Sequence, residues 1–157
     1  MNNVHPATLE LDNAIFLPEV IRVIEEGHTA TIMLKGYSMR PFLENGRDKA
    51  VLTKPTTPTV GKPVLAEIMP GRFVLHRIID IKGDEVTLLG DGNLRPEHCR
   101  LQDIRADVVG FYRKGRSKLD LTSGLKWRTY SKVWMALWPA RRYLLAFYRR
   151  IWLRLTR

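Results

Sequence analysis

Short β-branched segments separated by tight turns fill the middle of the chain, and this pattern limits the folds that it can adopt. Turn signals such as Asn45-Gly46, Pro70-Gly71 and Gly83-Asp84 end each segment after a few residues. Strands joined by turns this tight pair in antiparallel fashion. We therefore predict a mainly β protein, with a small antiparallel coiled or barrel-like sheet over residues 29–114. The predicted strands are Thr29–Lys35, Lys49–Thr53, Pro63–Met69, Arg72–Ile81, Glu85–Leu89 and Val108–Arg113.

The residues on either side of this β domain have different patterns. Residues 1–28 are predicted to form a lead-in and then a short helix at Leu17–Glu26, which Gly27 ends. Residues 115–124 are polar and are predicted to be a linker. Residues 125–157 are predicted to form a basic, aromatic, amphipathic helical tail.

Positive charge is concentrated in this tail. The net charge is +10, and residues 125–157 hold nine of the 26 lysine and arginine side chains but none of the 16 acidic ones. The rest of the chain is close to neutral, so it has no charge excess that would indicate a nucleic-acid groove in the β domain.

Two segments place reactive side chains in or beside the predicted strands. Ser38 lies on a turn just after a strand, between Gly36 and Pro41, where its hydroxyl can project from the edge of the sheet. His76 lies inside the apolar strand Arg72–Ile81, where burial favours the neutral imidazole that a general base requires. Taken singly, each has an ordinary structural explanation, as a turn serine and a core histidine.

A third segment supplies carboxylates. Asp91 lies in the turn Gly90-Asp91-Gly92-Asn93 after the next strand, and Glu97 follows six residues later. A carboxylate beside a histidine fixes the tautomer of the ring and stabilises the imidazolium formed after proton transfer. Asp91 could equally bond to its own backbone in a tight turn.

Taken together and in this order, the segments resemble the S24/S26 superfamily of serine peptidases, which contains the type I signal peptidases and the self-cleaving repressors. The resemblance runs from Gly36 to Gly110, and its specific blocks are Ser-Met-x-Pro and His-Arg-Ile. The blocks that carry it are Gly36-Tyr37-Ser38-Met39-Arg40-Pro41, Asn45-Gly46-Arg47-Asp48, Gly61-Lys62-Pro63-Val64, His76-Arg77-Ile78, Gly90-Asp91-Gly92-Asn93 and Val109-Gly110.

The resemblance implies a serine endopeptidase that cleaves a peptide or precursor protein in the manner of a signal peptidase. Ser38 would be the nucleophile and His76 its base, because the endoplasmic-reticulum and archaeal-type signal peptidases have histidine where the other branch has lysine. The acid would be Asp91, with Glu97 as the alternative. Backbone groups of Ser38, Met39 and Gly36 would hold the oxyanion, although signal peptidases often have a hydroxyl residue in place of Gly36.

Other readings of the β domain stay open. It could be a catalytically inactive module of the same fold that binds peptides or associates with membranes. A self-cleaving repressor is disfavoured, because the residues before the first strand are too few for a helix-turn-helix bundle and the lysine base is missing. We expect no cofactor and no metal, since His5, His28 and His98-Cys99 lack the spacing of metal ligands. The sequence does not indicate an oligomeric state.

The tail has the pattern of a helix that lies in a membrane interface. A helical wheel of residues 140–155 places arginines in one arc and aromatic and aliphatic side chains opposite them. Packing on the β domain or on a partner, and binding to nucleic acid, are the alternatives. The expected membrane-contacting residues are Trp134, Trp138, Arg141, Arg142, Phe147, Arg149, Arg150 and Trp152.

Localisation signals are weak. The N-terminal MNNVHPATLELD lacks the basic start and apolar run of a signal peptide. The longest uncharged apolar run, Val133–Ala140, is far shorter than the ~20 residues of a spanning helix. We therefore expect a cytoplasmic protein that associates peripherally with the membrane.

Overall fold

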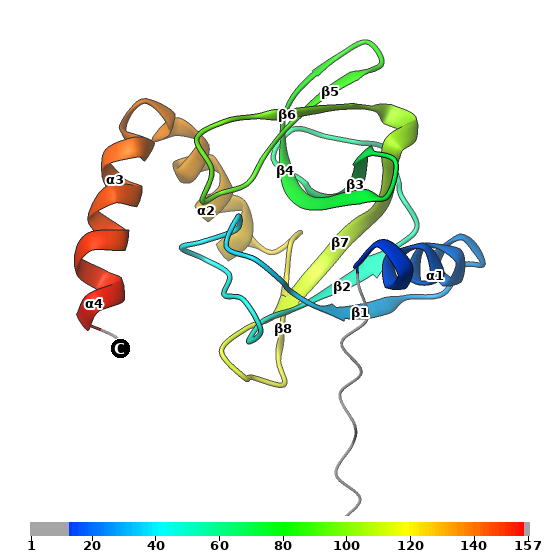
Figure 1. Cartoon of the computed structure of the whole chain (residues 1–157), viewed down its shortest axis with the longest axis horizontal. Coiled ribbons are helices and arrows are strands. Elements are labelled where there is room, and N and C mark those ends of the chain that lie inside the picture. Colours follow the sequence, from blue (N-terminus) through cyan, green and yellow to red (C-terminus); the bar gives the residue numbers. More distant parts are fainter. Residues whose placement is uncertain (1–12, 156–157) are drawn as a thin grey trace, which may run out of the picture.

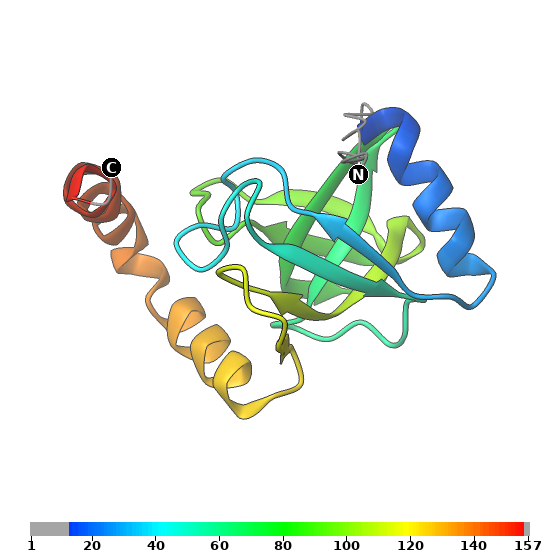
Figure 2. The same ribbon diagram turned by 90° about the horizontal axis from the view of Figure 1, so that it is seen from below.

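The computed structural model describes residues 13–155, in which helices flank a sheet of antiparallel strands (Figure 1). Helix α1 (Asn13–Glu25) comes first and lies on the side of the sheet opposite to the C-terminal helices (Figures 1 and 2). The strands are β1 (Ala30–Met33), β2 (Lys49–Thr53), β3 (Pro63–Met69), β4 (Arg72–Lys82), β5 (Glu85–Leu89), β6 (Glu97–Arg100), β7 (Ile104–Tyr112) and β8 (Leu119–Leu121). A short 3-10 turn, η1 (Leu101–Asp103), joins β6 to β7.

The strands form one sheet in the order β1-β2-β7-β3-β4-β5-β6, with β8 paired to β7. Every pair is antiparallel, which confirms the predicted mainly antiparallel β class. His76 on β4 lies opposite Val64, and Arg77 lies opposite Leu89 at the end of β5. This register brings the turn after β5 alongside the middle of β4.

Two of the observed strands were not predicted from the sequence, and the bounds of β1, β4 and β7 differ from the prediction. The polar segment β6 forms because it pairs with β5 along its whole length. The predicted linker, residues 115–124, is partly wrong, because β8 pairs with the end of β7. In addition, β7 begins at Ile104 rather than Val108, and α1 begins at Asn13 rather than Leu17.

Two apolar clusters stabilise the sheet. The first joins α1, through residues such as Ile24, to β1, β2 and β7. The second lies around Val64 and Ile78. Along β4, Phe73 and Leu75 pack against the first cluster, whereas Val74 packs against the second. Successive side chains of β4 therefore contact different clusters, as the alternation of a regular strand requires.

The tail divides into a helix that packs on the sheet and a helix that extends away from it. The elements are α2 (Leu125–Ala136), η2 (Trp138–Ala140), α3 (Arg141–Phe147), the π-helical turn η3 (Tyr148–Trp152) and α4 (Leu153–Leu155). Trp127 of α2 is 3% exposed and packs against Phe42 and Phe111. Helices α3 and α4 continue beyond it to one side of the molecule (Figure 2). None of the helices within residues 13–155 has the length and hydropathy needed to cross a bilayer.

Candidate active site

Ser38 and His76 line the same cavity. Ser38 is half-buried in the loop between β1 and β2, and His76 lies on β4 with 3% of its surface exposed. The cavity has a volume of about 110 Å³, and Leu34, Met39 and Phe73 contribute to its walls. A larger groove of about 660 Å³ runs along α2 but contains neither of these two polar side chains. We take the smaller cavity as the candidate site because it contains a hydroxyl and an imidazole that could act together.

The turn after β5 holds the Ser38 loop against His76. A Cβ atom placed on Gly90 would lie 2.5 Å from the Ser38 carbonyl oxygen and 2.9 Å from His76 Nε2. Both groups therefore lie within 2.9 Å of the same point, a space that only glycine leaves free. The N–H of Gly92 also donates to the Ser38 carbonyl oxygen at 2.7 Å. The two candidate residues, distant in sequence, are thus brought together by this turn.

A carboxylate contacts the other nitrogen of the imidazole. His76 Nδ1 lies 2.8 Å from Glu97 Oε2, an ion-pair distance. Within residues 13–155 neither atom makes a hydrogen bond of regular geometry, so this close contact is the one that each of them has. Arg72 donates to the second oxygen of Glu97 at 3.1 Å. The contact favours the tautomer with the proton on Nδ1, which leaves the Nε2 lone pair facing the Ser38 loop.

Burial sets the protonation state of His76. Desolvation lowers the pKa of His76 below its ordinary value, and the negative charge of Glu97 opposes this shift. The imidazole is therefore neutral near pH 7 and able to accept a proton, as a general base must be.

Asp91, the acid favoured from the sequence, is not the partner of His76. Both of its carboxylate oxygens accept hydrogen bonds from Arg77, at 2.9 and 2.7 Å. Neighbouring residues on a strand point to opposite faces, so a carboxylate bound to Arg77 is turned away from the His76 ring. The contact with His76 falls instead to Glu97, the alternative acid.

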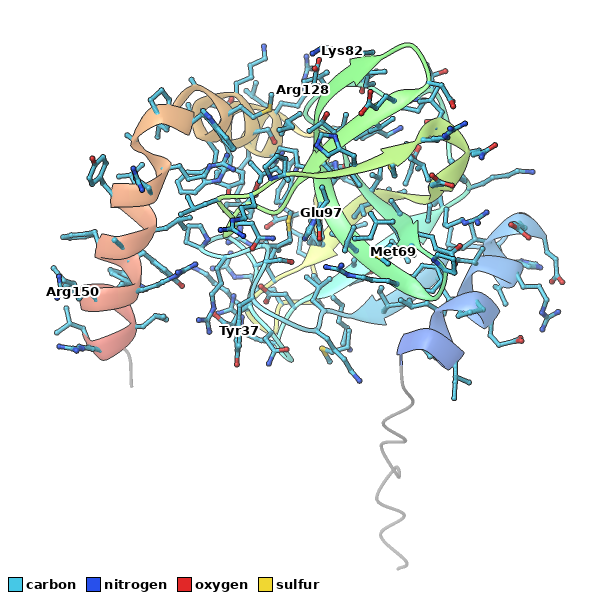
Figure 3. All side chains as sticks on the ribbon, turned by 45° about the horizontal axis from the view of Figure 1, so that its top comes forward. Tyr37, Met69, Lys82, Glu97, Arg128 and Arg150 are labelled. Carbon is cyan, nitrogen blue, oxygen red and sulfur yellow. The ribbon has the colours of Figure 1, made fainter. Side chains whose placement is uncertain are left out.

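Strand register explains why Glu97 reaches His76. Ile78 pairs with Leu88, and Leu88 pairs with Glu97. Directly opposed residues share a face of the sheet, and His76 shares that face with Ile78 because the two are two positions apart. Figure 3 shows Glu97 among the strands. From the sequence, Glu97 was only the alternative acid, because β6, which sets this register, was not predicted.

Helix α2 supplies three partners that sequence motifs did not indicate. Tyr130 donates to the Asp91 carboxylate at 3.0 Å, and the Trp134 indole donates to the Asp91 carbonyl oxygen at 3.1 Å. Ser131 accepts a hydrogen bond from Arg77, which also donates to the Gly61 carbonyl oxygen at 2.9 Å. Arg77 follows His76 in the sequence and Asp91 follows Gly90. Hydrogen bonds with α2 therefore hold both residues in place beside the candidate site.

The backbone of the Ser38 loop offers donors for an oxyanion. Within the described part of the chain, the N–H groups of Ser38 and Met39 have no protein acceptor. The N–H of Gly36, by contrast, donates to the Asn45 side chain at 2.8 Å. Ser38 and Met39 therefore remain candidates for this role, whereas the Gly36 N–H is already occupied.

Cys99 and the possibility of a metal site were the other reactive features to consider between residues 13 and 155. Cys99 is buried, and burial, with a contribution from Asp103, raises the pKa of its thiol to about 11. Such a thiol is protonated at neutral pH and is a poor nucleophile. Between residues 13 and 155, no group of three or more His, Cys, Asp or Glu side chains could hold a metal ion.

A hydroxyl, a neutral imidazole and a carboxylate in this order can perform acyl transfer. The hydroxyl attacks a carbonyl carbon, the imidazole accepts and returns the proton, and the carboxylate stabilises the imidazolium. No protein-family model and no curated protein sequence matches this chain. Function is therefore inferred from the arrangement of Ser38, His76 and Glu97.

Proposed function

We propose that the protein is a serine endopeptidase built on an antiparallel domain of the signal-peptidase and repressor type, with a coiled, barrel-like sheet. The observation that carries the proposal is the position of His76. Its Nδ1 contacts Glu97, while its Nε2 and the Ser38 backbone approach the same point beside Gly90. The resemblance of the Ser38 and His76 segments to the Ser–His branch of the S24/S26 peptidases adds support.

The reaction proceeds through an acyl-enzyme. Ser38 Oγ attacks the peptide carbonyl carbon while His76 Nε2 takes the hydroxyl proton, and the N–H groups of Ser38 and Met39 hold the oxyanion. The tetrahedral intermediate collapses, the C–N bond breaks, and His76 returns the proton to the departing amine. Water then attacks the acyl carbon while His76 takes its proton, the bond between this carbon and Ser38 Oγ breaks, and His76 returns the proton to Oγ as the carboxylate product leaves. Glu97 stabilises the imidazolium of His76 during both acylation and deacylation.

The cavity beside Ser38 restricts the substrate. Its volume of about 110 Å³ suits a small side chain next to the scissile bond, and its lining combines apolar residues such as Leu34 and Leu43 with the charged Lys35 and Glu44. A peptide that places such a residue against Ser38 would bind in an extended form along the neighbouring strand edge. The substrate class is therefore an unfolded peptide or a flexible segment of a precursor protein.

A peptide library tests the proposal. We expect the wild-type protein to generate new N-termini in a proteome-derived peptide library, detected by mass spectrometry, with a shared small residue before the cut. Ser38→Ala should reduce cleavage by at least about 10³-fold. The exposed Ser117→Ala serves as the matched control and should cleave normally.

Two results would reject the enzyme proposal. Cleavage at the same sites by Ser38→Ala would mean that Ser38 is not the nucleophile. Binding of library peptides without cleavage by the wild type would favour the alternative, an inactive peptide-binding module.

A further inference from the structure

The last helical segment of the tail exposes large apolar side chains on one side. Tyr143 is 71% exposed, Phe147 62%, Ile151 43% and Leu155 76%. We call these four residues the outer face. On a helical wheel they fall in one arc, opposite to the buried side chain of Leu145.

Exposed arginines lie on the same helical segment as the outer face. Arg142, Arg150 and Arg154 are all exposed, and residues 125–157 contain no acidic side chain. Figure 3 shows Arg150 on the side of the helix that faces away from the sheet. The surface therefore combines apolar area with uncompensated positive charge.

The opposite side of the same segment is held to the protein body. Arg141, 1% exposed, donates to the Trp134 carbonyl oxygen at 3.2 Å. Arg149 donates to the Gly92 carbonyl oxygen at 3.1 Å, in the turn that contacts Ser38. Burial corrects part of the sequence prediction, because Trp134 and Arg141 are enclosed by the protein, whereas Arg149 is exposed and stays a predicted membrane contact. The membrane-contacting set keeps Trp138, Arg142, Phe147, Arg149, Arg150 and Trp152, all of them exposed.

We propose that the outer face docks on the interface of a bilayer that contains anionic lipid. Aromatic and aliphatic side chains would enter the boundary between head groups and acyl chains, while Arg142, Arg150 and Arg154 would contact lipid phosphates. A nucleic acid would match the charge but would leave Phe147, Ile151 and Leu155 exposed to water. An anionic membrane surface satisfies both the apolar area and the charge.

Docking would place the candidate active site beside the membrane. The outer face belongs to the helix whose Arg149 contacts Gly92, and Gly92 contacts the Ser38 loop. A bound helix would therefore keep this loop close to the lipid surface. The docking surface itself does not depend on whether Ser38 is catalytic.

Vesicle co-sedimentation of the full-length protein tests the proposal. We expect binding to vesicles of three parts phosphatidylcholine to one part phosphatidylglycerol, and weaker binding to pure phosphatidylcholine. The double variant Arg150→Gln/Arg154→Gln should weaken binding to the anionic vesicles by about thirtyfold. Phe147→Ser/Ile151→Ser should weaken binding to the anionic vesicles by about tenfold or more.

Matched variants elsewhere on the surface are the controls. Lys82→Gln/Arg100→Gln removes two exposed cations from the sheet, and Met69→Ser removes an exposed apolar side chain that is 58% exposed. Both should bind as the wild type does, and circular dichroism should show that every variant is folded. Absence of binding to anionic vesicles, or equal losses in test and control variants, would overturn the proposal. Binding to duplex DNA but not to vesicles would overturn it in favour of a nucleic-acid partner.

Discussion

The two halves of the basic tail, residues 125–140 and 141–157, have the same number of aromatic residues but different environments. Helix α2 buries Trp127 at 3% exposure and Trp134 at 9%, and it places Tyr130 on Asp91. The segment from α3 to α4 leaves Phe147 and Leu155 mostly exposed. One half packs on the sheet and supports the candidate site, whereas the other is anchored on one side, through Arg141 and Leu145, and leaves its other side exposed.

The difference shows that aromatic and basic content alone does not determine the role of a helix. Arg141 and Arg150 belong to the same segment, but the first is 1% exposed and the second is exposed to solvent. What separates the two halves is whether the sheet presents a complementary surface. The aromatic rings of α2 pack on Phe42 and Phe111. Its polar groups form hydrogen bonds with the Arg77–Asp91 pair.

Truncating a buried ring of α2 should produce the largest effect on stability. Trp127→Ala removes a side chain packed on Phe42 and Phe111, so the free energy of unfolding should fall by about 3–5 kcal/mol. Urea unfolding followed by circular dichroism measures this change. The matched variant Phe147→Ala should change stability by no more than about 0.5 kcal/mol. Equal losses would mean that the two halves do not differ as described.

Loss of the Tyr130 hydroxyl on α2 should lower the stability of the protein by a smaller amount. Tyr130→Phe removes the donor to the buried Asp91 carboxylate, so the free energy of unfolding should fall by about 1.5–3 kcal/mol. Tyr143→Phe, at a position 71% exposed, is the control and should be neutral. An unchanged Tyr130→Phe variant would show that α2 does not support the Arg77–Asp91 pair.

The smallest expected effect is on the pH dependence of cleavage. Glu97 favours the protonated imidazole, so Glu97→Gln should lower the pKa of His76 further and move the acid limb of the pH–rate profile to lower pH. Arg150→Gln should leave the limb in place, because salt screens an exposed charge on the outer segment. An acid limb that shifts in the Arg150→Gln variant but not in the Glu97→Gln variant would contradict the contact between His76 and Glu97.

Local patterns predicted much of the sheet. The bounds of β2, β3 and β5 are as predicted, because each has a strongly β-forming sequence between clear turn signals. Strand β6 was missed since Glu97-His98-Cys99-Arg100 has little intrinsic strand character and depends on pairing with β5. Strand β8 was missed for the same reason, because its three residues are ordered by β7.

The site was predictable where a residue carries its own signal. Ser38 and His76 stand out by their turn and strand contexts, and the structure brings them to one cavity. The carboxylate partner depends on register across β4, β5 and β6, which no local pattern encodes. The contributions of Tyr130 and Ser131 depend on how α2 docks, so they were equally invisible in the sequence.

The central claim is that Ser38 and His76 act as one catalytic unit. The direct measurement is the cleavage rate of the best library peptide by Ser38→Ala, His76→Ala and the double variant. If the two side chains serve the same step, the double variant is no slower than the slower single variant. A His76→Ala variant with the wild-type rate, or losses that multiply in the double variant, would contradict the account.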